Sequence, residues 1–137
     1  IDDYGHHPTA IRATIEAVRT RYPGRRLWLA HEPLTFHRAA AMLDGLATAL
    51  AEADAVVVAD IWAGRDPDTT ITSAAELAGR VATISGREVA APGSPEATAD
   101  YLRARVQAGD VVLAMGGGRS YVIAERLLTL LAADGAE

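Results

Sequence analysis

Residues 111–120 read VVLAMGGGRS, and this stretch decides the class of fold. Its first five residues are apolar without alternation, which is typical of a strand covered on both faces, as in a parallel sheet. The glycines at 116–118 lead into a segment with the apolar spacing of a helix, to about Ala133. The stretch therefore predicts a buried strand, a glycine loop and a helix, which is the repeating unit of an α/β fold.

Short apolar runs alternate with helical segments along the rest of the chain. Continuous apolar runs at 55–59 and 27–30 predict two more buried strands, and weaker strands are expected at 1–4 and 88–91. Helices are expected at about 8–22, 36–53, 73–85, 95–108 and 120–133, the third of them capped by Thr72. With right-handed crossovers, this order predicts a mostly parallel, Rossmann-like sheet of about six strands with helices on both faces and with binding loops at the strand ends.

The composition limits the classes of function. A chain of 137 residues, half of them hydrophobic, is long enough for one domain with one core. Its formal net charge of −5 offers no basic surface for nucleic acid, and it has neither a long apolar run nor a signal-like segment, so we expect no membrane partner. Cysteine is absent, which fits a cytoplasmic location, and the absence of lysine excludes a P-loop or Schiff-base lysine within the chain.

Ionisable side chains are concentrated at residues 2–8, DDYGHHP, where a strand is expected to end and a helix to begin. Such places gather ligand-binding groups in α/β folds. The carboxylates of Asp2 and Asp3 can accept from ribose hydroxyls or hold a metal-bound water, and His6 and His7 can meet phosphate or carboxylate oxygens near a positive helix end. The cluster predicts a ligand site, and a free-standing metal hydrolase using these four side chains is a second interpretation.

The string DDYGHHPT at residues 2–9 is similar to the opening of the C-terminal domain of the Mur ligases, the ATP-dependent ligases of peptidoglycan synthesis. The similarity continues in order through Pro33, Arg38 and the segment 55–65 to the apolar strand before the glycines, so it covers nearly the whole chain. Among these ligases, the chain most resembles the group that joins L-alanine to UDP-N-acetylmuramate.

The resemblance implies a reaction and partners. In such ligases ATP and magnesium convert the muramyl carboxylate to an acyl phosphate, which the amino group of an amino acid then attacks. Residues 1–137 would be the amino-acid-binding domain that closes over a central ATPase domain, with the N-terminal and central domains outside this chain. The P-loop lysine and the magnesium ligands would belong to the central domain, so the isolated domain is expected to be inactive. The start at Ile1, without Met and within an expected strand, favours an excised fragment.

The resemblance also assigns roles to single residues near the start of the chain. It implies that Asp3 binds the ATP ribose, that Tyr4 lies near the adenine and that His6 faces the reaction centre as the catalytic residue. His7, at the start of the first helix, is expected to contact the substrate.

Three residues further along are also expected to bind the substrate. Arg38 is expected to clamp a carboxylate, because its planar fork can bind both oxygens at once. Gly116 and Gly117 stand in the glycine-rich turn of the family, where backbone N–H groups can approach a ligand closely. Two histidines are interpreted as structural, and three charged residues as members of a polar loop near the site: His31, His37, Asp60, Arg65 and Asp66.

Residues 31–38 depart from the family, which usually reads FQPHRYSR where this chain reads HEPLTFHR. The family's histidine and arginine of the amino-acid end are replaced by Leu34 and Thr35, so the added amino acid is left open. The pair Glu32-Pro33 is instead similar to the murein-peptide (Mpl-type) ligases, which join a tripeptide to the same sugar nucleotide. These replacements, with Arg119 in place of the usual aspartate, also leave open a non-catalytic nucleotide-binding or assembly module.

Overall fold

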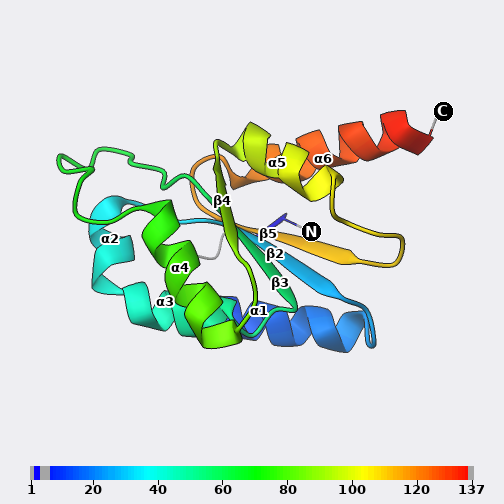
Figure 1. Ribbon diagram of the computed structural model, residues 1–137, viewed down its shortest axis with the longest axis horizontal. Coiled ribbons are helices and arrows are strands. Elements are labelled where there is room, and N and C mark those ends of the chain that lie inside the picture. The colour runs from blue at the N-terminus through cyan, green and yellow to red at the C-terminus, as the bar shows by residue number, and fades with distance from the viewer. Residues whose placement is uncertain (1, 4–6, 136–137) are drawn as a thin grey trace.

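Five parallel strands form the sheet of the computed structural model, which describes residues 2–3, in backbone alone, and 7–135 (Figure 1). The strands are β1 (Asp2–Asp3), β2 (Leu27–Glu32), β3 (Ala55–Ala59), β4 (Ala90–Gly93) and β5 (Val111–Gly116). Their order across the sheet is β1-β5-β2-β3-β4, so β2 is central, between β5 and β3. The expected parallel α/β sheet is confirmed, with five strands in the described part of the chain where about six were expected.

Helices cover both faces of the sheet, as expected. They are α1 (Pro8–Arg21), α2 (Phe36–Ala41), α3 (Leu43–Leu50), α4 (Ala74–Ser85), α5 (Pro95–Arg103) and α6 (Ser120–Gly135). α1, α3 and α4 pack on one face of the sheet, and α5 and α6 pack on the other (Figure 1). Within the described residues, no helix is both long and apolar enough to cross a bilayer.

The continuous apolar runs form strands that are buried on both faces. On β2, Leu27 and Leu29 belong to the core beneath α1, α3 and α4, whereas Trp28 and Ala30 belong to the core beneath α5 and α6. Because successive side chains of a strand point to opposite faces, a strand between two helical layers is apolar at most of its positions. Full burial of a side chain such as Leu29 stabilises the fold by about 1.5–3 kcal/mol.

The central strand β2 is longer at its carboxyl end than the apolar run at 27–30 predicts. It continues through His31 and Glu32, which pair with Met115 and Gly116 of β5. His31 is fully buried and Glu32 is 2% exposed. Hydropathy does not identify such polar residues as strand, so the expected strand is two residues short. The burial of His31 within the sheet agrees with its interpretation as structural.

The helix expected at 36–53 is in fact two helices, α2 and α3, which meet at Met42. Met42 has φ −111° and ψ 17°, and its N–H donates to the carbonyl of Arg38 to end α2. The chain changes direction there (Figure 1), which brings Gly45 of α3 so close to the start of α1 that a Cβ would lie 3.2 Å from the ring of Pro8. Apolar spacing persists across Met42, so the break is not visible in the sequence.

Three other boundaries differ from the expected ones. α4 is capped by Ser73 rather than Thr72: the Ser73 hydroxyl accepts from the backbone N–H of Glu76, while Thr72 bonds the Glu76 carboxylate. β4 begins two residues later than the expected strand at 88–91, and α5 ends at Arg103, more than a turn early. Pairing with β3, rather than local hydropathy, sets the position of β4.

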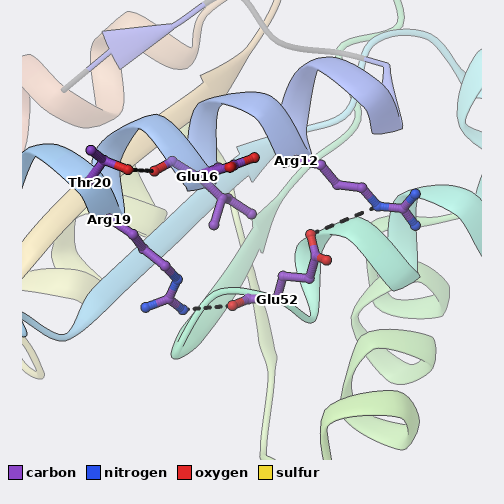
Figure 2. A pocket seen from close by; sticks show the side chains of 6 residues that line it. Arg12, Glu16, Arg19, Thr20 and Glu52 are labelled. Carbon is purple, nitrogen blue, oxygen red and sulfur yellow. Dashed lines mark hydrogen bonds and ion pairs between the residues drawn. The ribbon is translucent and has the colours of Figure 1, made fainter. Parts of the chain in front are cut away.

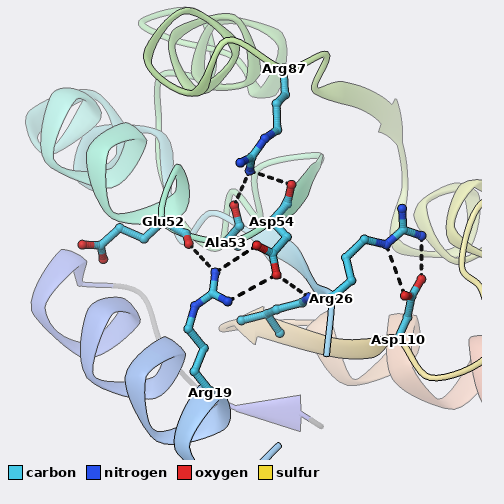
Figure 3. Close-up of polar contacts among 8 residues, drawn as sticks. Arg19, Arg26, Glu52, Ala53, Asp54, Arg87 and Asp110 are labelled. Atoms are coloured by element: carbon cyan, nitrogen blue, oxygen red, sulfur yellow. Dashed lines mark hydrogen bonds and ion pairs between the residues drawn. The ribbon is translucent and has the colours of Figure 1, made fainter. Parts of the chain in front are cut away.

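At the amino ends of the strands, Asp54 ties β2 to the turn before β3 (Figure 3). Its Oδ2 accepts a hydrogen bond of 2.7 Å from the backbone N–H of Leu27, and Arg19 of α1 contacts both carboxylate oxygens at 3.3 Å. Arg87 donates to the carbonyls of Ala53 and Asp54 at 3.0 and 2.7 Å. One carboxylate therefore fixes the start of β2 against both α1 and the segment that leads into β3.

Hydrogen bonding sets the ionisation of the two carboxylates at this edge. Partial burial of Asp54 favours its neutral form, but hydrogen bonds from Leu27 and Arg19 favour the carboxylate more strongly, so the pKa of Asp54 lies below its ordinary value. The hydrogen bond from Arg26, at 2.6 Å, likewise lowers the pKa of Asp110. Both groups are therefore charged at neutral pH and stabilise the folded state.

We expect Asp54→Ala to lower the free energy of unfolding at pH 7 by about 1–2 kcal/mol, the lower part of the range for hydrogen bonds to a charge, because the side chain is 35% exposed. Since the pKa of Asp54 is lower in the folded state, its contribution is complete above the unfolded value of about 4 and is lost as the pH falls through the folded value. Urea unfolding between pH 7 and pH 2 measures the difference from the wild type, which should shrink on acidification.

Glu125→Ala removes an exposed carboxylate from α6 and serves as the control for this experiment. A difference between the wild type and Asp54→Ala that stays constant across the whole pH range would contradict the role given to the Asp54 carboxylate.

Candidate functional site

Three chain segments leave the carboxyl edge of the sheet next to one another. Asp3, the last residue of β1, pairs with β5, and Gly116, the last residue of β5, pairs with Glu32 of β2. Because the three strands are parallel and adjacent, the segments that follow them begin at the same edge. This edge therefore gathers Asp3 of the opening cluster, the glycine loop 116–118 and the segment 33–38.

The structure locates some of the predicted site residues and not others. The side chains of Asp3, Tyr4 and His6 lie outside the described residues. His7 is described, and its Nδ1 accepts a hydrogen bond of 3.1 Å from the N–H of Thr9, which caps α1. The cap uses Nδ1, and Nε2 of this exposed ring has no hydrogen-bond partner among residues 7–135, so it can meet a substrate. The roles expected of Asp3, Tyr4, His6 and His7 stay predictions.

Two glycines of the loop after β5 are required by close contacts. Gly116 has φ 154°, and a Cβ there would overlap the carbonyl oxygen of Glu32 and lie 3.0 Å from the Glu32 Cβ. Gly118 has φ 59°, and a Cβ there would overlap the indole ring of Trp62. The loop is therefore held against β2 on one side and Trp62 on the other. Whether the N–H groups of Gly116 and Gly117 bind substrate stays a prediction.

Glu32 is a buried carboxylate at this edge. Its Oε1 accepts a hydrogen bond of 2.7 Å from the backbone N–H of Arg119, directly before α6, where the helix dipole favours a negative charge. The Arg119 side chain reaches Glu96 in the first turn of α5, and the pKa of Glu96 is lowered by its own backbone N–H and by this ion pair. Glu32 thus anchors the glycine loop to β2, a role that becomes visible only in the fold.

The segment after β2 is fixed to the segment after β3 by a parallel bridge between Leu34 and Trp62. The N–H of Thr35 donates to the Trp62 carbonyl at 2.8 Å, and the N–H of Trp62 donates to the Pro33 carbonyl at 2.9 Å. Thr35 has φ 57° and ψ 149°, a conformation that β-branched residues rarely adopt and that costs about 1–3 kcal/mol. Such strain persists only where surrounding contacts hold the residue, as this bridge does.

The residues that replace the family's histidine and arginine serve the fold itself. Leu34 is 6% exposed, and the hydroxyl of Thr35 caps α2 by accepting from the N–H of Arg38 at 3.3 Å. The Arg38 side chain is exposed, and among the side chains of residues 7–135 none forms an ion pair with it. Its guanidinium is thus free to bind a carboxylate, and the clamp stays a prediction.

The segment after β3 supplies a buried carboxylate to α2. Asp66, whose side chain is 2% exposed, accepts a 2.8 Å hydrogen bond from the N–H of His37 and lies 2.5 Å from the Nδ1 of the His37 ring. Burial favours the neutral acid, but the hydrogen bonds from His37 outweigh it, so the pKa of Asp66 lies below its ordinary value. Residues 29 positions apart meet here, which no local pattern in the sequence reveals.

Two hollows lie away from this edge. One of about 630 Å³ lies between α1 and the end of α3 (Figure 2), and another of about 690 Å³ is lined by Asp54 and its neighbours. In the first, Arg12 faces Glu52 at 3.8 Å and Arg19 donates to the Glu52 carbonyl at 2.7 Å. In the second, Arg19 and Arg87 bind Asp54. These charges are used within the fold, so the size of a hollow does not identify the functional edge.

Comparison with known proteins adds an independent observation. The profile of the family described as Mur ligase, glutamate ligase domain, matches residues 1–118. The UDP-N-acetylmuramate–L-alanine ligase of Alkaliphilus metalliredigens is 38% identical over 93% of this chain, which corresponds to 27% of that protein. The chain thus spans about a quarter of the length of the curated relatives that it matches.

Solved structures share the fold. The UDP-N-acetylmuramate-alanine ligase MurC of Thermotoga maritima superposes with a TM-score of 0.78 over 98% of this chain and 26% of its own, at 19% identity, which shows the fold alone. The murein peptide ligase of Psychrobacter arcticus superposes with a TM-score of 0.70 over 93% of this chain and 26% of its own, at 25% identity. The carboxyl edge described above therefore belongs to a fold shared by both kinds of ligase.

We expect Gly118→Ala to destabilise the protein by about 1–3 kcal/mol more than Gly86→Ala, because the added methyl group overlaps the Trp62 indole. Gly86 is the matched control: its φ is 70°, and no atom lies within 4 Å of its Cβ position, so alanine there brings backbone strain alone. Chemical unfolding measures both losses, and tryptophan emission in a Trp28→Phe background reports on Trp62. If Gly118→Ala and Gly86→Ala lost the same free energy of unfolding and the Trp62 emission did not change, the packing of Gly118 on Trp62 would be contradicted.

Proposed function

The chain belongs to the family of Mur ligase C-terminal, glutamate-ligase-type domains, and from this premise we propose that it serves an ATP-dependent ligase that joins L-alanine to UDP-N-acetylmuramate. The observation that carries the proposal is the 38% identity, over 93% of the chain, to a ligase named for that reaction. The remaining length of such a ligase supports the further proposal that the N-terminal and central ATPase domains work together with residues 1–137.

In this proposal the carboxyl edge divides into a nucleotide end and an amino-acid end. Asp3 and Tyr4 bind the ribose and adenine of ATP, and His6 acts at the reaction centre. The support for Asp3 is its place at the end of β1, opposite Met115 and so beside the glycine loop, and the support for Tyr4 and His6 is the resemblance of residues 2–9 to the family. Arg38 clamps the carboxylate of the incoming amino acid, and its support is an exposed guanidinium without an ion-pair partner among the side chains of residues 7–135.

The remaining assignments concern the substrate contacts at the loop starts and the metal. His7 and the N–H groups of Gly116 and Gly117 bind anionic oxygens of the substrate. Magnesium is assigned to the central domain, as the resemblance to the Mur ligases implies. Catalysis then rests on positioning and on stabilising the charge that develops on the acyl phosphate.

A murein-peptide ligase is the second candidate, because Glu32-Pro33 matches that group and a murein peptide ligase is 25% identical in its solved structure. The inward-facing Leu34 and the capping Thr35 also leave fewer contacts for a free amino acid than the family usually offers. A tripeptide would bring its own additional contacts to such a site. The two candidates differ only in the amine substrate, so one assay separates them.

We expect the intact ligase to release ADP continuously only when UDP-N-acetylmuramate and a nucleophile, here L-alanine, are both present, and residues 1–137 alone to form none. A coupled assay of ADP release measures both. Product formation with L-alanyl-γ-D-glutamyl-diaminopimelate in place of L-alanine would establish the second candidate instead. Binding of nucleotide without turnover by the intact protein would indicate a non-catalytic module, and robust ATP turnover by residues 1–137 alone would overturn the proposal.

We expect Arg38→Lys to raise the KM for the amine substrate about tenfold or more, with a smaller change in kcat, because an ammonium cannot form the paired hydrogen bonds of a guanidinium. Steady-state kinetics of the intact ligase measures the changes in KM and kcat separately. Arg126→Lys is the control, since Arg126 pairs with Asp100 of α5 at 3.1 Å, within the α5–α6 layer. Equal effects of the two substitutions would argue against the clamp.

A further inference from the structure

His37 and Asp66 form a dyad with one buried and one exposed member. The Asp66 side chain is 2% exposed, whereas that of His37 is 62% exposed, and Asp66 bonds both the ring Nδ1 and the backbone N–H of His37. An imidazole whose Nδ1–H donates to a carboxylate carries its lone pair on Nε2. The dyad therefore presents a hydrogen-bond acceptor on the exposed side of the ring, with its tautomer fixed from the buried side.

The surrounding backbone holds the dyad in place from two directions. His37 lies in the first turn of α2, directly after the strained Thr35, and Asp66 follows Trp62 in the segment after β3. The bridge between Leu34 and Trp62 joins these two segments, and Gly118 packs on the Trp62 ring. Backbone strain that tertiary contacts maintain is concentrated at functional sites. The dyad thus belongs to the same rigid edge as the glycine loop.

Arg38 is the next residue of the same helical turn, so its side chain leaves α2 about 100° from that of His37. An α-amino acid carries its carboxylate and its ammonium on one carbon. The guanidinium of Arg38 can bind the carboxylate of an amino acid, and the imidazole lone pair of His37 can accept a hydrogen bond from its ammonium group.

We propose that His37, oriented by Asp66, is the proton acceptor for the amine that this ligase joins to its carboxyl substrate. The inference rests on the proposed function and deepens it, because it names the group that makes the amine nucleophilic. It also differs from the sequence-based interpretation of His37 as a structural residue. Asp66 is a positioning residue in this scheme, acting through the imidazole.

Amide formation from an amine that binds as ammonium requires the removal of two protons from its nitrogen. Nε2 of His37 takes one proton from the ammonium, and the freed lone pair forms a C–N bond to the carbonyl carbon of the acyl phosphate. The C–O bond to phosphate breaks with its electron pair, and the second proton of the nitrogen leaves with the phosphate. The products are the amide, hydrogen phosphate and a protonated His37, which returns its proton to solvent.

Two carboxylates beside the ring favour this proton transfer, and the positive charge of one neighbouring guanidinium opposes it. Asp66 and Asp68 approach from the segment after β3, and Arg38 follows in α2. Protonated His37 would be stabilised by Asp66, whose hydrogen bonds keep its pKa low and its carboxylate charged. Asp68 itself is bound to Thr70, with its Oδ1 2.6 Å from the hydroxyl and 2.8 Å from the N–H.

The test compares two nucleophiles in the intact ligase. Hydroxylamine is uncharged at neutral pH and needs no base, so it traps the acyl phosphate as a hydroxamate directly. We expect His37→Gln to reduce amide formation about 100- to 10,000-fold, the usual range for a general base, while hydroxamate formation stays within threefold of the wild type. We expect kcat/KM for amide formation by His37→Gln to rise with pH across the whole neutral range, because only amine that is already uncharged can then react, and we expect a weaker pH dependence for the wild type.

Asp66→Asn is the second variant, and it should reduce amide formation about tenfold or more with hydroxamate formation retained. Glu125→Gln is the control, because it makes the same charge change at an exposed carboxylate of α6, outside the segment that faces the His37 ring. Equal losses of amide and hydroxamate in His37→Gln and Asp66→Asn, or unimpaired amide formation in both, would overturn the inference. Failure of the wild type to form hydroxamate would instead count against the proposed ligase function.

Discussion

The close approach of β5 to β2 at Gly116 and Glu32 is the constraint on which the rest of the structure depends. The two strands stay paired through their last residues, and the Glu32 carbonyl leaves no room for a Cβ at Gly116. The pairing buries the Glu32 carboxylate, which then bonds the N–H of Arg119 and fixes where α6 begins. The loops that follow β2 and β5 therefore begin side by side, at the last paired residues of the two strands.

The carboxylates at the amino edge of the sheet serve the fold, whereas the carboxyl edge also presents an exposed charged group. At the amino edge, Asp54 and Asp110 are each bound by an arginine side chain and a backbone N–H, so their charges stabilise the fold. At the carboxyl edge, Thr35 is strained and the Arg38 side chain is exposed. Charged groups that already have partners stabilise the fold. A charged group that the neighbouring backbone holds at the surface can bind a ligand instead. This asymmetry supports the carboxyl edge as the working edge of the domain.

The departures from the family in residues 31–38 have a common physical consequence. Leu34 joins the core and Thr35 caps α2, so neither contributes a polar group to a substrate. The same segment, however, positions Arg38 and the His37 ring on one turn of helix, with Asp66 behind the ring. If the proposed function is right, the amino-acid end of the site therefore lacks two polar contacts from Leu34 and Thr35. It has instead the His37 imidazole, which is hydrogen-bonded to the Asp66 carboxylate.

Local patterns were sufficient for the α/β class, for the strand at 55–59 and for the helix starts at Pro8 and Ser120, because hydrophobic periodicity and capping act over a few residues. The order of residues likewise placed the opening cluster and the glycine loop at strand ends. The break at Met42, the burial of Glu32 and the pairing of His37 with Asp66 arose only in the folded chain. Each depends on partners far away in sequence, whose approach is governed by packing across the sheet rather than by neighbouring residues.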